Sequence, residues 1–147
     1  MKRCLLIGVA SLLVFSACKK NSVSSEFAGS WKVTQIIDKS TNSISYPPSG
    51  QDLNIEITFI SAHEFAGHTL RNTLDDGDYT KTGDQIVFNG FSMTKVGEDE
   101  FGTAFLTVLT PCYLQSTTPC TPSKISVEGN LMKISSPFRY DIVLIKV

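Results

Sequence analysis

The 147-residue chain carries little charge, and neither sign dominates. Charged residues make up 18% of it, and 13 Lys and Arg face 14 Asp and Glu, so the formal net charge is −1. Without a basic block the chain lacks the phosphate attraction that most nucleic-acid binders use, so we expect no nucleic-acid partner. Hydrophobic residues make up 41% and include nine Phe, which argues against disorder and favours one folded domain.

The sequence also lacks common catalytic and metal-binding motifs. It contains neither G-x-x-x-x-G-K-[ST] nor G-x-S-x-G. His63 and His68 are five positions apart, whereas the zinc-protease motif needs histidines four apart on one helical face. The run Asp75–Asp78 lacks the alternating acids and distal Glu of a calcium loop, and we expect a solvated turn there. We therefore expect no catalytic residues, no metal and no cofactor.

No hydrophobic run is long enough to cross a bilayer. The longest, residues 4–15, is far shorter than the ~20 residues of a transmembrane helix. It follows a short basic start and ends in small residues, a pattern typical of a cleaved signal peptide, here residues 1–17. The segment Phe15-Ser16-Ala17-Cys18 resembles a bacterial lipobox, with Phe where Leu is commoner. This resemblance implies cleavage before Cys18 and acylation of Cys18.

An acylated Cys18 predicts a membrane anchor. Each buried methylene contributes ~0.8 kcal/mol, so several acyl chains hold a protein in a bilayer without a transmembrane helix. Lys19 and Lys20 stand where enteric inner-membrane lipoproteins carry acidic retention residues, which favours the outer membrane. Residues 18–26 then form the lipidated cysteine and a polar tether. The alternative is an ordinary secretory signal with a chance cysteine.

Cleavage would also change the composition of the exported chain. Loss of Lys2 and Arg3 leaves 11 basic residues against 14 acidic ones, a net charge of −3. Apart from Cys18, the remaining cysteines are Cys112 and Cys120, in a proline-rich segment. In an oxidising compartment we expect a structural disulfide between them, worth ~2–3 kcal/mol. Free thiols are one alternative, and a redox or metal-binding pair is another, although redox pairs prefer C-x-x-C and zinc needs two more ligands.

Residues 27–147 mostly follow the two-residue period of β-strands. We expect strands near residues 31–38, 53–59, 63–68, 79–81, 85–89, 124–128, 131–135 and 141–147, with a loop at 40–51. Residues 98–109 instead show helical spacing of their apolar positions, Phe101, Phe105, Val108 and Leu109. The predicted fold class is α+β: a mostly antiparallel sheet or small barrel with one packed helix.

The first expected strand begins with Gly29-Ser30-Trp31. Trp31, Val33 and Ile37 are expected to share the face that turns to the core. Lipocalin-like barrels carry a similar Gly-x-Trp, whose Trp closes the base of the barrel. The alternative is a Trp packed under the first turn, which suits its amphipathic ring. This motif motivates the second candidate function, a lipocalin-like carrier of a small apolar ligand.

The order of several short motifs resembles the META domain family. These motifs are Gly29-Ser30-Trp31, Phe65–Asn72, Gly77-Asp78-Tyr79, Gly83–Phe88, Ser92–Lys95 and Val127–Leu131. The resemblance covers residues 27–147 and implies an α+β fold that is exported, often lipid-anchored and linked in some bacteria with heat shock or envelope stress. The chain departs from the family by lacking the cysteine often found beside the motif Asn and by inserting the Cys112–Cys120 segment.

The resemblance implies no established catalytic residues. It implies that six residues shape the fold: Gly29, Trp31, Gly67, Asn72, Gly77 and Tyr79. Glycine permits the positive φ of tight turns, and Asn can bond the backbone of its own turn.

These features predict a non-enzymatic, membrane-anchored envelope lipoprotein with a structural, protein-interaction or envelope-stress role. Its partners would be the lipid bilayer, through Cys18, with another envelope protein as a candidate. The interior of the domain separates the two functions. A carrier needs an open apolar cavity, whereas a META-like domain fills that space with its helix, Phe101 and Phe105. An unrecognised hydrolase would need a clustered Ser, His and carboxylate.

Overall fold

The structure, a computed structural model, describes residues 27–50, 54–111 and 120–147. The predicted signal peptide 1–17, the predicted lipidated tether 18–26 and Cys112 lie outside the described residues, so the anchor and the Cys112–Cys120 pairing stay predictions. The described elements are, in chain order, β1 (Gly29–Asp38), β2 (Ser43–Ser45), β3 (Glu56–Phe59), β4 (Glu64–His68), β5 (Thr73–Thr82), β6 (Gln85–Met93), α1 (Glu100–Leu109), β7 (Ser123–Glu128), β8 (Leu131–Ser135) and β9 (Tyr140–Lys146).

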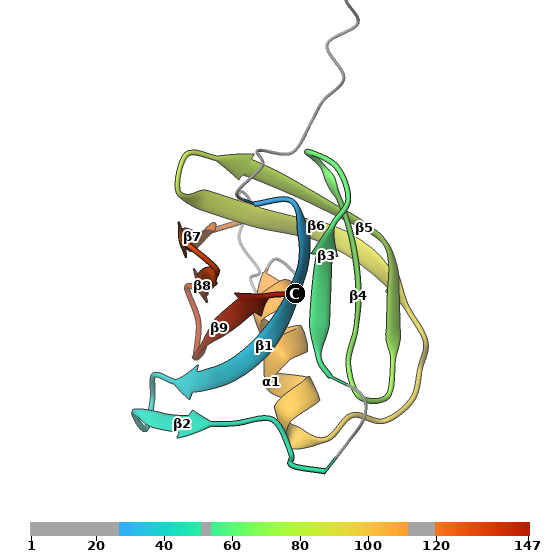
Figure 1. Cartoon of the computed structure of the whole chain (residues 1–147), viewed down its shortest axis with the longest axis vertical. Coiled ribbons are helices and arrows are strands. Elements are labelled where there is room, and N and C mark those ends of the chain that lie inside the picture. Colours follow the sequence, from blue (N-terminus) through green and yellow to red (C-terminus); the bar gives the residue numbers. More distant parts are fainter. Residues whose placement is uncertain (1–26, 51–53, 112–119) are drawn as a thin grey trace, which may run out of the picture.

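Eight strands close into an antiparallel barrel. Their order is β1-β3-β4-β5-β6-β7-β8-β9, and β9 pairs with β1 to complete the ring. The short β2 pairs with the last residues of β1, beyond the stretch that pairs with β3. Figure 1 shows β2 at the end of the molecule where α1 begins. The predicted α+β class, a small antiparallel barrel with one packed helix, is confirmed.

Helix α1 begins where the sequence places a cap. The Asp99 carboxylate accepts a hydrogen bond from the backbone N of Gly102 at 2.7 Å, and Glu100 adds negative charge to the first turn. The face predicted to be apolar is buried: Phe101, Phe105, Val108 and Leu109. This face packs against β9 and β1, so the helix prediction is confirmed, with the start at Glu100.

Aromatic rings fill the barrel beside the start of β1. We call this group the aromatic cluster, and its members are each at most 2% exposed: Phe27, Phe59, Phe65, Tyr79 and Phe88. The ring centroid of Phe59 lies 4.1 Å from that of Phe27 and 5.1 Å from that of Tyr79. The rings are tilted or edge-on to one another, as aromatic pairs prefer.

The barrel interior is packed elsewhere as well. Five large side chains from four strands and the helix are fully buried: Trp31, Ile57, Phe105, Ile134 and Leu144. The indole Nε1 of Trp31 donates to the carbonyl of Phe27 at 3.0 Å, which gives the buried ring its polar partner. The helix and these side chains therefore occupy the space that an apolar cargo inside the barrel would need.

The inward face of β1 differs from the prediction beyond Val33. Ile37 is only partly buried, whereas Ile36 is 2% exposed. The pairing of β1 with β9 shifts register between Val33 and Gln35, which marks a β-bulge. A bulge adds one residue to one strand and exchanges the two faces beyond it. The inward assignment of Ile37 is therefore wrong, and Ile36 and Asp38 turn inward instead.

Two predicted loop segments are strands in the structure. Asp75–Asp78 lies within β5, where Asp75 pairs with Ser92 and Asp78 with Gly90 of β6. The strand is irregular here, with register shifts in its pairing to β6 and a φ of 52° at Asp76. Turn-like residues suit such an irregular stretch, and this accounts for the predicted turn. Residues 43–45 of the predicted loop 40–51 form β2, because the end of β1 offers backbone partners there.

The glycines named as fold positions act in two ways. Gly29 has a φ of 101°, which glycine adopts without strain. Gly67 and Gly77 do not have a positive φ, so the turn expected at Gly77 is wrong, while Gly67 lies in the strand expected over 63–68. A Cβ on Gly67 would lie 2.5 Å from the carbonyl oxygen of Glu56, and one on Gly77 would lie 2.6 Å from the Phe65 ring. Both glycines allow neighbouring strands and side chains to approach closely.

Candidate functional site

A pocket of about 350 Å³ lies beside the end of β1, and we call it the β1–α1 pocket. Strands supply one side of it: Ile36 and Asp38 come from β1, Ser43 and Ser45 from β2, and Tyr46 follows β2 directly. The bulge in β1 turns Ile36 and Asp38 toward this space. An acid therefore stands at an inward position of a strand whose other inward residues are apolar.

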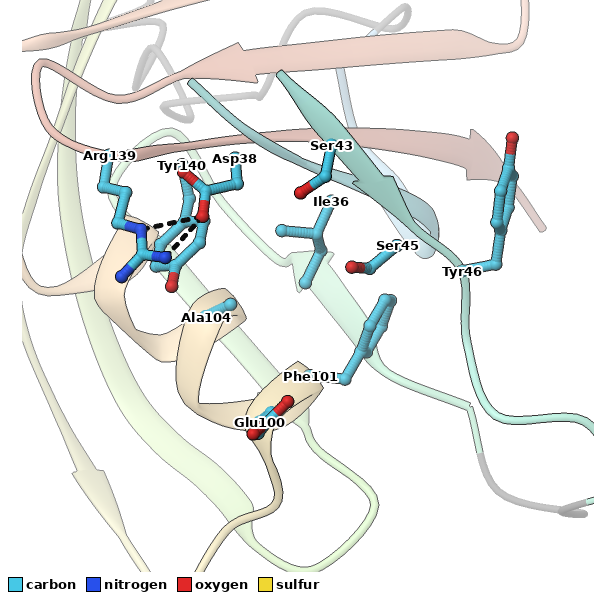
Figure 2. A pocket seen from close by; sticks show the side chains of 10 residues that line it. All are labelled: Ile36, Asp38, Ser43, Ser45, Tyr46, Glu100, Phe101, Ala104, Arg139 and Tyr140. Atoms are coloured by element: carbon cyan, nitrogen blue, oxygen red, sulfur yellow. Dashed lines mark hydrogen bonds and ion pairs between the residues drawn. The ribbon is translucent and has the colours of Figure 1, made fainter. Parts of the chain in front are cut away.

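Helix α1 and the start of β9 supply the other side. Glu100, Phe101 and Ala104 come from the first turns of α1, Tyr140 begins β9, and Arg139 precedes it. Figure 2 shows Arg139 and Tyr140 together with Asp38 on one side of the pocket and Tyr46 on the other. Tyr46 is 63% exposed and the Arg139 side chain 55%, so both are open to solvent.

An ion pair organises the Arg139 side of the pocket. Arg139 Nε and Nη2 donate to Asp38 Oδ2 at 2.8 and 2.5 Å. Asp38 Oδ1 accepts from the backbone N and the hydroxyl of Ser40 at 2.9 and 2.6 Å. The Arg139 bond, followed by those from Ser40, holds the pKa of Asp38 well below its usual range. Asp38 is therefore an ionised group that fixes the position of Arg139.

Arg139 also lies over an aromatic ring. Its guanidinium carbon is 5.0 Å from the centroid of the Tyr140 ring, within the range of a cation–π contact. The ion pair and the ring contact together fix the plane of the guanidinium. Nη1 takes part in neither Asp38 bond.

A second polar cluster holds the chain that leads into α1. Asn72 Nδ2 donates to the carbonyl of Val96 at 2.7 Å and to the Glu98 carboxylate, and its Oδ1 accepts from the backbone N of Val96 at 2.8 Å. Thr69 Oγ1 accepts from the backbone N of Asn72 at 2.8 Å and donates to Glu98 at 2.5 Å. The expectation that the Asn72 side chain bonds its own turn is wrong, because Thr69 bonds that turn and Asn72 reaches the distant segment.

The six predicted fold positions lie in the barrel wall, its core and the turn after β4, and none lines the β1–α1 pocket. Trp31 and Tyr79 are buried, at 0% and 1% exposed. The Tyr79 hydroxyl donates to the carbonyl of Ser61 at 2.7 Å, and burial raises the pKa of Tyr79 to about 12. Cys120 lies in the segment before β7, while its predicted partner Cys112 is outside the described residues.

The two histidines do not form a site together. His63 is exposed before β4, and His68 ends that strand. Within residues 27–50, 54–111 and 120–147, no group of three or more His, Cys, Asp or Glu is placed to hold a metal ion. In the same ranges, no helix is both long enough and apolar enough to span a membrane.

No local sequence pattern identifies the residues that organise the pocket. Asp38 and Arg139 are 101 positions apart, so no local motif joins them. Tyr46 and the serines of β2 lie in the segment expected to be a loop. One local feature points to Asp38: it is an acidic residue at the end of a strand whose inward positions are apolar. Only the bulge decides that it faces inward, and a bulge has no clear signature in this sequence.

The architecture defines a class, a small closed antiparallel barrel with one internal helix. No family model matches the sequence, and no curated protein matches it. The fold is similar to the NMR structure of a protein from Burkholderia xenovorans, with a TM-score of 0.60 and 13% sequence identity. The similarity covers 100% of this chain and 98% of that chain. At this identity the likeness shows the fold alone.

Proposed function

We propose that the chain is a non-enzymatic, lipid-anchored binding module of the bacterial envelope that offers the β1–α1 pocket to a partner. The pocket carries this proposal, because a fixed guanidinium and an exposed aromatic ring flank the same hollow. Arg and Tyr are among the residues that contribute most energy at binding surfaces. A few fixed polar groups in a concave site are typical of ligand recognition.

The location of the pocket suits a protein anchored through Cys18. Phe27, where the tether 18–26 would join the domain, packs in the aromatic cluster beside the start of β1. The pocket lies at the other end of β1, a strand of ten residues. At ~3.3 Å per residue such a strand spans roughly 30 Å. The pocket would then face away from the bilayer that holds the acyl chains.

The interior of the barrel favours binding at the surface over carriage of an apolar ligand inside. Trp31 and Phe105 are both 0% exposed and occupy the interior together with α1. This packing supports the META-like reading of the motif order, in which the helix fills the domain. The lipocalin-like carrier is the alternative that it disfavours.

The anchor is tested by Cys18→Ser in the full chain. We expect the wild-type chain to fractionate with the outer membrane, and the variant to appear as a soluble or unprocessed form because acylation is lost. Fractionation followed by immunoblotting measures this. An unchanged membrane fraction for Cys18→Ser would contradict the lipid anchor.

Binding through the pocket is tested by site-specific photo-crosslinking in intact envelopes. A photoreactive residue in place of Tyr46 should give a discrete adduct, whereas one in place of Lys124, an exposed residue of β7 outside the pocket, should not. Mass spectrometry of the adduct identifies the partner. Equal labelling from the two positions, or none from position 46, would rule out this pocket as the binding surface.

A further inference from the structure

We infer that the β1–α1 pocket binds a neutral carbohydrate, a mono- or disaccharide unit, an assignment that deepens the proposed function and rests on it. The volume is suitable, because pockets for small molecules begin at about 300 Å³ and this one has about 350 Å³. Its contributing elements are fixed: β1 and β2 by their pairing, α1 by its buried face and Arg139 by Asp38. A small ring can therefore enter without reorganising the barrel.

The hydrogen-bonding groups of the pocket match a polyol. Ser43, Ser45, Tyr46 and Tyr140 bring hydroxyl groups, each of which can both donate and accept. Arg139 adds N–H donors, and Glu100 adds an acceptor. Sugar hydroxyls also donate and accept, so several can be satisfied at once in such a lining. An apolar ligand would displace water from these groups without replacing its hydrogen bonds.

The charges of the pocket disfavour an anion. Asp38 already neutralises Arg139 through two hydrogen bonds to one carboxylate oxygen. An anion would therefore gain little from Arg139 and would be repelled by Glu100 and Asp38. The hydroxyl groups and the Tyr46 ring, and not the charges, favour a neutral sugar over a cation, and a cationic control tests that choice. A neutral ligand still uses the charged groups as strong hydrogen-bond partners.

Tyr46 supplies the apolar surface that a sugar ring needs. Its side chain is 63% exposed at the edge of the pocket, opposite the Arg139 group in Figure 2. One face of a pyranose presents C–H groups that pack on an aromatic ring, while its hydroxyls point outward. Pro47 and Pro48 follow Tyr46 and restrict the backbone there, so less freedom is lost on binding. A pyranose in the pocket would contact the Tyr46 ring on one side and the hydrogen-bonding groups of Arg139 and Tyr140 on the other.

The test is saturation-transfer NMR and titration calorimetry on the full chain, purified in a detergent without sugar headgroups. Chitobiose and maltose are the carbohydrate probes, and acetate and ethylammonium are the charged controls. We expect transfer to the ring protons of at least one disaccharide and none to the controls. Tyr46→Ala should weaken that binding roughly tenfold or more, which corresponds to the loss of one good contact. Ile44→Ala, exposed on the same segment but outside the pocket, should leave it unchanged.

Three results would overturn the assignment: no transfer to either disaccharide, equal affinity in Tyr46→Ala, or tighter binding of a charged control. Tyr46→Phe separates the ring from its hydroxyl and should retain most of the affinity. The circular dichroism spectrum of each variant shows whether it is folded. If a protein partner crosslinks at position 46 and neither disaccharide binds, the carbohydrate assignment fails while the proposed binding module stands. If the disaccharide binds but Cys18→Ser stays in the membrane, the anchor fails alone.

Discussion

At its start β1 enters a cluster of aromatic rings, and at its end it reaches a pocket built from an ion pair and hydroxyls. The aromatic cluster joins residues that face one another across adjacent strands, such as Phe59 and Phe65. The β1–α1 pocket joins Asp38 to Arg139, from the two ends of the chain. Rings in the cluster are at most 2% exposed, whereas Tyr46 and Arg139 are more than half exposed.

This difference separates stability from binding within one barrel. Burial of large apolar surface stabilises the aromatic cluster, at roughly 25 cal/mol per Å². The Arg139 side of the ion pair is exposed, and an ion pair open to solvent contributes much less to stability than the buried rings do, so the pocket residues are not explained by folding alone. If the comparison holds, substitutions in the cluster should destabilise the fold, and substitutions at the exposed side of the pocket should affect binding.

Phe59→Ala should have the largest effect. The Phe59 ring is 1% exposed and packs on Phe27 and Tyr79, so its removal leaves a cavity. We expect the free energy of unfolding to fall by ~3–5 kcal/mol, measured by urea denaturation. Phe59→Leu keeps more of the volume and should lose less. A loss below ~1 kcal/mol for the alanine variant would show that the cluster is loosely packed.

Gly77→Ala tests the close approach within the same region. The new Cβ would lie 2.6 Å from both the ring and the carbonyl oxygen of Phe65, so the strands must shift. Overpacking of this kind costs ~1–3 kcal/mol, again measured by urea denaturation. Gly97→Ala is the matched control, because nothing lies within 4 Å of its Cβ position. Equal stability of the two variants would contradict the tight packing of β4 on β5.

Acid should act on the pocket through Asp38. The pKa of this carboxyl is lowered in the folded chain, mainly by its bonds from Arg139. Its stabilising contribution is therefore fully present above the ordinary aspartate pKa of about 3.9 and is lost as the pH falls through the lower folded-state value. Thermal unfolding from pH 7 to pH 2 should show this loss below about pH 4. The decrease should be shallower in Asp38→Asn, and an identical pH profile would show that the pair contributes nothing.

Tyr46→Ala should have the smallest effect on the fold. The ring is mostly exposed, and exposed substitutions usually change the free energy of unfolding by no more than ~0.5 kcal/mol. Thermal unfolding of the variant should therefore match the wild type while sugar binding at the pocket decreases. A loss of stability comparable to that of Gly77→Ala would make Tyr46 a structural residue and remove the contrast between the two regions.

Local patterns were sufficient for most elements of the barrel. The alternation of Ile55, Ile57 and Phe59 placed a core strand, and all three are buried. The spacing of Phe101 and Phe105 placed the helix and its buried face. These features depend on neighbours within a few positions, because side-chain direction repeats every two residues in a strand and every 3.6 in a helix.

Long-range pairing decided the features that were predicted wrongly. The run Asp75–Asp78 has turn-like residues, yet the flanking strands draw it into β5. Ile37 follows the correct period for a regular strand, and the bulge before it reverses its face. Thr69, not Asn72, bonds the turn after β4, because Asn72 meets Val96 and Glu98 of a segment distant in sequence.

The sequence by itself determined an antiparallel, Phe-rich domain with one helix, because burial of apolar side chains at fixed periods is a local property. It also predicts the lipid anchor at Cys18. Only the tertiary structure decided that the sheet closes through β1 and β9, and that Asp38 meets Arg139 beside Tyr46. The reason is physical: closure brings the first and last strands together, and a single bulge determines which side chain faces the pocket.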